Sequence, residues 1–154
     1  MKVPKFAARL VLLVVAMATV VLGSAIGASA GGTGATTNLT YTPTRLSFGG
    51  IRVSDVSKKN VSFTNTNGGI NLVLDSTGFS SGLYFVLGPD NGNAGSCAYY
   101  GYLLLGGSTC WVEVMFEPGP KGHFTDTLTT QWYELGACCT ITDTTVTALS
   151  GSAH

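Results

Sequence analysis

The clearest pattern of apolar and polar residues lies between positions 110 and 117. Two sets of side chains alternate there, with Cys110, Val112, Val114 and Phe116 in one set and Trp111, Glu113 and Met115 in the other. A period of two is typical of a β-strand with one face in a core. Two glycines precede this stretch and Pro118 follows it, so neither flank favours a longer strand. We predict a strand over 110–117 with Trp111 and Met115 on its outward face.

Other short apolar segments follow the same pattern, separated by clusters of Gly, Pro, Asn, Asp and Ser that favour turns. They are residues 46–48, 61–63, 70–74, 83–87, 102–105, 124–132 and 141–149. The run 83–87 is apolar throughout, which predicts a strand buried on much of both faces. In 124–132, Leu128 is expected to face inward. No helical repeat appears after residue 30, so the pattern predicts an all-β fold, a β-sandwich of seven to eight strands.

The first thirty residues have the form of a secretory signal peptide. An apolar run over 10–22 is followed by Ala28-Ser29-Ala30 and preceded by three basic residues, Lys2, Lys5 and Arg9. We expect cleavage after Ala30 and a secreted or cell-surface protein. The alternative is an uncleaved anchor, the one case in which the chain would contact a membrane, although the run is shorter than the roughly 20 residues that a spanning helix needs.

Residues 31–44 differ in composition from the rest of the chain. They are rich in Gly, Thr, Asn and Ala, so they have little to bury and are expected to form a flexible leader or an edge strand. Asn38-Leu39-Thr40 matches the glycosylation acceptor pattern, which is frequent by chance in such sequences. We assign residues 45–153 to one sandwich domain. The leader could also add as a strand to a neighbouring copy and build a filament.

Charge excludes one class of partner. Without residues 1–30 the chain keeps five basic residues against eight acidic ones, a formal net charge of −3. Nucleic-acid binding needs a basic surface, so nucleic acid is not an expected partner. The apolar fraction of 45% is large enough to supply a core and does not indicate disorder.

All four cysteines lie after the expected signal peptide, at positions 97, 110, 138 and 139. Export makes disulfides the expected state, and four cysteines allow three pairings. We favour Cys97 with Cys110, because closing that loop would stabilise the fold by about 3 kcal/mol and hold a tyrosine-rich loop against the 110–117 strand. For Cys138 and Cys139 three readings stay open: a structural bridge or a bond between the two neighbours that stiffens a loop, redox exchange by the pair, or a bond to another chain.

Several of these segments, taken in order, resemble the immunoglobulin-like domains of the ASPM–SPD-2–Hydin type, known in bacterial surface proteins as choice-of-anchor D domains. The matching pieces are Leu46-Ser47-Phe48-Gly49, Phe63-Thr64-Asn65-Thr66, Cys97, Gly107-Ser108-Thr109-Cys110, Val112, Val114, Phe116, Pro118, Gly122, Phe124, Leu128 and Ala148-Leu149-Ser150-Gly151. The resemblance implies a non-enzymatic extracellular module with a disulfide between Cys97 and Cys110. This chain departs from the pattern in its single copy, its insertion at 134–139 and the place of Val146.

Catalytic and metal-binding residues are sparse. The two histidines are His123, in an expected turn, and His154, so no catalytic constellation can be proposed and we predict no enzyme activity. The stretch 90–93, Asp-Asn-Gly-Asn, lacks the spaced acidic ligands of a calcium loop and favours a turn. We therefore predict no metal and no cofactor.

Aromatic residues are the strongest candidates for function. The predicted interaction surface comprises Tyr99, Tyr100, Tyr102, Trp111, Met115, Trp132 and Tyr133. Exposed aromatic rings suit protein contacts, and they also stack on sugars. The leading hypothesis is a structural or adhesive module with a protein partner or self-association; the alternative is carbohydrate binding. Another segment could instead fold over these side chains and bury them.

Overall fold

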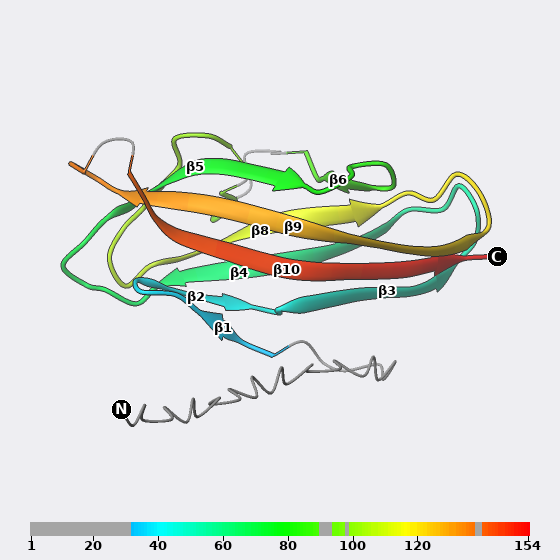
Figure 1. Ribbon diagram of the computed structural model, residues 1–154, viewed down its shortest axis with the longest axis horizontal. Helices are drawn as coiled ribbons and strands as arrows, with labels where there is room; N and C mark the ends of the chain where they lie inside the picture. The colour runs from blue at the N-terminus through cyan, green and yellow to red at the C-terminus, as the bar shows by residue number, and fades with distance from the viewer. Residues whose placement is uncertain (1–31, 90–93, 98, 138–139) are drawn as a thin grey trace, which may run out of the picture.

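The computed structural model describes residues 32–89, 94–97, 99–137 and 140–154. The expected signal peptide, the turn at 90–93 and the pairing of Cys138 and Cys139 lie outside these residues. The described chain is all β and forms two five-stranded sheets packed as a sandwich, which confirms the predicted fold class (Figure 1). A search of the described residues for a helix long and apolar enough to cross a membrane finds none.

The two sheets contain the strands in a different order from the sequence. Sheet A has the order β1-β2-β4-β8-β6, with bounds Gly34–Ala35, Leu39–Thr42, Ser57–Asn65, Thr109–Phe116 and Phe85–Leu87. Sheet B has the order β3-β10-β9-β5-β7, with bounds Arg45–Ile51, Ile141–Ala153, Gly122–Glu134, Leu72–Phe79 and Leu103–Leu104. Strand β3 runs parallel to β10, whereas the other paired strands are antiparallel.

Strand β8 has the alternation that the sequence predicts. Its inward side chains, Cys110, Val112, Val114 and Phe116, are all fully buried. The Phe116 ring packs on two other core rings, with centroids 4.9 Å from Phe85 and 5.7 Å from Phe48. Because Phe48 belongs to sheet B and Phe116 to sheet A, the contact between these two rings joins the two layers.

The disulfide between Cys97 and Cys110 is present, as predicted. Both cysteines are buried, and the backbone N–H of Cys97 donates to the carbonyl of Trp111 at 2.9 Å. Ser96 forms a parallel bridge to Trp111 on the same side. The segment 95–97 is therefore fixed along β8 both covalently and by backbone hydrogen bonds.

The leader contributes two strands to sheet A and more to the core than its composition suggests. Strand β2 pairs antiparallel with β4, and β1 pairs with β2 at the edge. Leu39 is fully buried and Asn38 is 3% exposed, so this stretch lies at the edge of sheet A and also adds two buried side chains that its composition does not indicate. The filament hypothesis needs a free leader, whereas these strands pair within their own chain.

The predicted strand 83–87 is shorter than expected. Strand β6 begins at Phe85 and lies at an edge of sheet A, and Leu83 is 72% exposed. The cause lies upstream, because residues 80–84 carry the chain from sheet B to sheet A. Asp126 accepts hydrogen bonds from the backbone N–H groups of Ser81 and Gly82, at 3.1 and 3.0 Å, and from the Ser80 hydroxyl. That turn prevents Leu83 from joining the strand.

Candidate functional site

Trp132 does not belong to the surface that the sequence predicts. Its side chain is fully buried, its ring lies 5.7 Å from that of Phe63, and its Nε1 donates to Thr130 Oγ1 at 2.9 Å. The residues that alternate inward along β9 are Leu128, Thr130 and Trp132. An aromatic ring so placed fills the core, so Trp132 stabilises the fold and contacts no partner.

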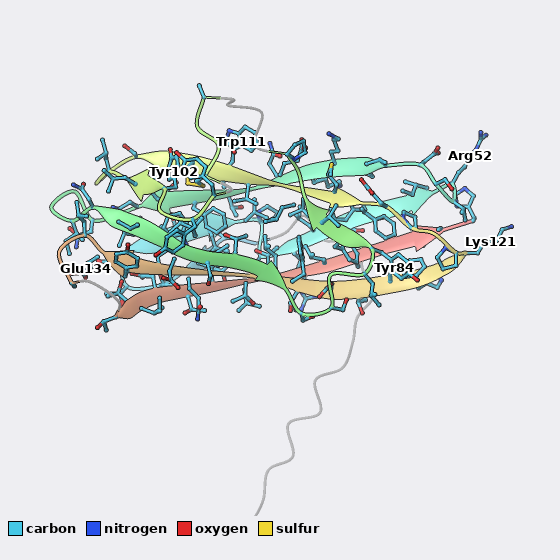
Figure 2. The ribbon with its side chains drawn as sticks, turned by 90° about the horizontal axis from the view of Figure 1, so that it is seen from above. Arg52, Tyr84, Tyr102, Trp111, Lys121 and Glu134 are labelled. Atoms are coloured by element: carbon cyan, nitrogen blue, oxygen red, sulfur yellow. A yellow bond between two sulfur atoms is a disulfide. The ribbon has the colours of Figure 1, made fainter. Side chains whose placement is uncertain are left out.

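Trp111 and Met115 point outward from sheet A, as predicted, and both are half-buried. The segment 95–97 lies beside Trp111; a Cβ added at Gly95 would be 3.4 Å from its Nε1. Figure 2 shows Trp111 on the side of the sandwich away from the β9–β10 layer. Tyr133 belongs to sheet B, so the predicted aromatic set does not form one surface.

The tyrosines at 99, 100 and 102 form a turn that leads into β7. The Tyr102 N–H donates to the Tyr99 carbonyl at 3.3 Å, and the two rings pack edge to face with centroids 5.4 Å apart. The Leu74 N–H donates to the Tyr102 carbonyl at 3.0 Å, so this turn extends the β5–β7 ladder. Burial, and secondarily the neighbouring Tyr99, raises the pKa of Tyr102. Tyr99 is 49% exposed and Tyr100 74% exposed, so this turn presents aromatic side chains to solvent.

Sheet B carries a row of apolar side chains on its outer face, across four neighbouring strands. The register pairs Ile141 with Tyr133, Tyr133 with Val73, and Val73 with Leu103. We call these four residues the apolar row. Leu72 and Leu74, on either side of Val73, are buried inside the sandwich, so Val73 and its cross-strand partners face outward. Val73 is nevertheless only 6% exposed, whereas Leu103 is 43% exposed.

Two more leucines extend this surface. Leu105 lies two residues after Leu103 on the same side of the chain, and Leu135 follows β9, where its N–H donates to the Asn71 carbonyl at 2.8 Å. Both leucines are more than half exposed. We define the β7-end surface as the apolar row together with Tyr99, Tyr100, Leu105 and Leu135. Sequence reasoning missed the leucines, although it predicted a short strand over 102–105 and alternation would have indicated Leu103 and Leu105 as one face.

Two acidic residues near this end, Asp143 and Glu134, accept hydrogen bonds from Asn38. Asp143 is buried and accepts from the Asn38 N–H at 2.9 Å, from Asn38 Nδ2 at 3.1 Å and from the hydroxyls of Thr36 and Thr142. Burial alone would raise the pKa of Asp143, but these hydrogen bonds lower it below its usual value. Glu134 accepts from Asn38 Nδ2 at 3.3 Å. The charged groups Arg52 and Lys121 lie at the opposite end of the sandwich from Glu134 (Figure 2).

The described residues offer little for catalysis or metal binding. No group of three or more His, Cys, Asp or Glu side chains among them could hold a metal ion. An open pocket of about 430 Å³ lies over β3, β10 and β9, between Arg45 and Asp126. The oxygens of Asp126 already accept several hydrogen bonds, which outweigh its burial and lower its pKa. This carboxylate therefore anchors a turn.

Comparison with known proteins supports the fold. No protein-family model matches the chain, and no curated protein matches its sequence. Among solved structures, the ASH / PapD-like domain 7 of human CEP192 matches with a TM-score of 0.59 at 14% identity, over 77% of this chain and 87% of that one. The VesB protease of Vibrio cholerae matches with a TM-score of 0.58 at 15% identity, over 76% of this chain and 32% of the protease.

The periplasmic chaperone SfaE matches with a TM-score of 0.53 at 9% identity, over 75% of this chain and 58% of the chaperone. At such identities a likeness shows the fold alone, and the fold of this chain is immunoglobulin-like. The narrower ASPM–SPD-2–Hydin assignment stays a prediction.

Proposed function

We propose that this chain is a non-catalytic immunoglobulin-like module, secreted or at the cell surface, that binds a protein partner through the β7-end surface. The observation that carries this proposal is the group of exposed apolar and aromatic side chains at this end of sheet B, Leu103, Leu105, Leu135, Tyr99 and Tyr100, which adjoin the largely covered part of the apolar row. Soluble monomers rarely expose contiguous apolar surface, and protein interfaces are enriched in tyrosine.

Location outside the cytoplasm is part of the same proposal. It is supported by the signal-peptide form of residues 1–30 and by the buried disulfide between Cys97 and Cys110, because structural disulfides persist in oxidising compartments. The resemblance to ASPM–SPD-2–Hydin domains, which are usually non-enzymatic, supports the absence of catalysis.

Site-specific photocrosslinking tests the proposal. A photoreactive phenylalanine analogue replaces Tyr100 in the chain produced by its own host, and a second chain carries it at Val146, which is 48% exposed on the β10 outer face. We expect protein adducts from position 100, and we expect the added substitution Leu103→Lys to abolish them. Position 146 should give none. Equal adducts from both positions, or none from position 100, would overturn the proposal.

Carbohydrate binding is the second candidate, favoured by the exposed rings of Tyr99 and Tyr100. Sugars stack on exposed aromatic faces. A glycan array should then show binding that Tyr100→Ala removes and Val146→Ala preserves. Trp132→Ala cannot serve in this test, because Trp132 is in the core and its removal would destabilise the whole domain. Absence of binding to any glycan would leave the protein-binding proposal alone.

A further inference from the structure

Asn67 and Gly68 lie in the turn between β4 and β5 and form an Asn-Gly pair. Asparagine is a labile residue, most of all before glycine, because glycine has no Cβ to hinder attack by its own peptide nitrogen on the asparagine side chain. Gly68 is exposed, and a Cβ built on it would meet nothing within 4 Å. Within the described part of the chain its N–H has no hydrogen-bond partner. The nucleophile for deamidation is therefore accessible.

The reaction needs only water as a co-reactant. The Gly68 nitrogen attacks Asn67 Cγ, the new C–N bond closes a succinimide ring, and the bond between Cγ and Nδ2 breaks. Nδ2 leaves as ammonia and takes the proton of the Gly68 nitrogen. Water then adds to either ring carbonyl and opens the ring, which leaves aspartate or isoaspartate at position 67. Both products carry a carboxylate where Asn67 has an amide.

The amide that would be lost connects the β4–β5 turn to the leader. Asn67 Nδ2 donates to Asn38 Oδ1 at 3.1 Å. The Nδ2 of Asn38 donates to Asp143 at 3.1 Å and to Glu134 at 3.3 Å, so the carbonyl and both N–H groups of this amide are in use. A carboxylate at position 67 has no N–H to donate. Turning the Asn38 amide over would serve position 67, but it would direct the Asn38 carbonyl at two carboxylates, which are acceptors too.

The backbone of the turn is also closely held. Asn67 Oδ1 accepts from the Gly69 N–H at 3.1 Å, and the Asn67 N–H donates to Asn65 Oδ1 at 3.0 Å. A Cβ at Gly106 would be 2.7 Å from the Gly68 carbonyl oxygen and 2.8 Å from that of Asn67, so two backbone segments are in close contact there. Isoaspartate adds a methylene to the main chain at this point, and the added length disturbs that contact.

We propose that Asn67 is a deamidation site, and that its conversion to a carboxylate loosens the edge that the leader forms in sheet A with β1 and β2. The coupling acts in both directions. The hydrogen bond to Asn38 holds the leaving Nδ2, so a paired leader slows the reaction, whereas the product cannot hold Asn38 and keeps the leader loose. Because water does not restore the amide, the change accumulates with the age of the protein. This site is separate from the β7-end surface and does not depend on it.

Peptide mapping by mass spectrometry tests the site. The folded chain is incubated at mildly alkaline pH, which favours attack by the peptide nitrogen, and the same chain in urea gives the rate without the fold. We expect aspartate and isoaspartate at position 67 in the folded chain, formed more slowly than in urea. Gly68→Ala, whose methyl group fits the open space there, should slow the reaction severalfold. A folded chain that keeps Asn67 intact for many half-lives of the reaction in urea would overturn the site.

The same measurement tests the control by the leader. Leu39→Ala removes a buried side chain of β2 and should speed deamidation of Asn67 severalfold. Leu128→Ala is the matched control, because Leu128 is equally buried but belongs to β9 in the other sheet, and its effect should be smaller. Equal rates in the two variants would show that global unfolding, and not the leader, controls the reaction.

Amide hydrogen exchange tests the consequence for the leader. Asn67→Asp carries one of the two products, and exchange at residues 36–41 should rise about tenfold or more, because facing acceptors replace a hydrogen bond. Exchange in β8 should stay slow, which identifies a local change. Asn60→Asp, at an exposed position on β4, introduces the same charge and should leave the leader unchanged. Equal exchange in the two variants would overturn the coupling, and so would a rise throughout the sandwich.

Discussion

The leader edge of sheet A buries its leucine, whereas the β7 edge of sheet B leaves two leucines exposed to solvent. At the leader edge Leu39 fills the core, and Asn38 is held by Asp143, Glu134 and Asn67 through hydrogen bonds of 2.9 to 3.3 Å. At the β7 edge the ladder has two register pairs, and Leu103 and Leu105 stay exposed.

The difference shows that the same residue type, leucine, can have different roles at two sheet edges. A leucine between polar neighbours, at the leader edge, is drawn into the core because buried hydrogen bonds fix the backbone around it. A leucine in an uncharged apolar stretch, at the β7 edge, is left outside because Leu104 and Leu72 already fill the core beneath it. The leader edge serves stability, and we propose that the β7 edge serves binding.

Two matched leucine substitutions test this comparison most strongly. Leu39→Ala removes a fully buried side chain and should lower the free energy of unfolding by about 3 kcal/mol. Leu103→Ala removes a side chain that is 43% exposed and should change it by less than about 0.5 kcal/mol. Urea denaturation measures both. Equal losses would show that the two edges do not differ.

Removing the disulfide should have the next largest effect. Cys97→Ala together with Cys110→Ala frees a loop of sequence separation 13, which should cost about 2–3 kcal/mol. Because the tyrosine turn follows Cys97, amide hydrogen exchange at residues 99–105 should rise sharply, while exchange at Leu39 stays slow. Unchanged exchange in 99–105 would mean that the β5–β7 ladder alone holds this turn.

Much of the core could be predicted from the sequence, because a period of two is a local signal. It gave the inward face of β8 correctly. The burial of Trp132 was also within reach, since it lies four residues after Leu128 and therefore on the same face of β9. It was missed because an aromatic residue in a polar stretch resembled a surface residue.

The leader and the β7-end surface could not be found in the same way. Nothing local indicates that Asn38 meets Asp143, because the two are 105 residues apart and the contact depends on the packing of both sheets. The apolar row likewise combines residues from four strands, two of which are far apart in the sequence. The register between strands that are distant in sequence determines which side chains become neighbours on such a surface. Local turn signals carry no information about that register.

Acid should loosen the leader edge first. The hydrogen bonds to Asp143 hold its pKa below the ordinary 3.8, so its contribution to stability is full above about pH 4 and is lost as pH falls further. Asp143→Ala leaves the N–H groups of Asn38 without their acceptor and should cost about 1–3 kcal/mol at neutral pH. Urea denaturation between pH 2 and 7 should show a weaker acid dependence in the variant. Asp75→Ala, in a half-buried position, is the matched control; a similar loss there would contradict the role of Asp143.

The smallest effect on stability should come from replacing Lys59, whose charged side chain lies against the exposed edge of strand β3. Lys59 Nζ donates to the Ser47 carbonyl at 2.6 Å, whereas its neighbour Lys58 pairs with Glu113 at 3.2 Å on the outer face of sheet A. Both pairs are exposed, so Lys59→Ala and Lys58→Ala should each change the free energy of unfolding by less than about 0.5 kcal/mol. Light scattering should distinguish the two variants. Lys59→Ala exposes the Ser47 carbonyl at the edge of β3 and removes the lysine charge that discourages pairing there. We expect the measured mass to rise on concentrating Lys59→Ala and to stay constant on concentrating Lys58→Ala. If neither variant associates, Lys59 does not protect the β3 edge from pairing with another chain. The difference between the β3 edge and the β7 edge then rests on the exposed leucines at β7 alone.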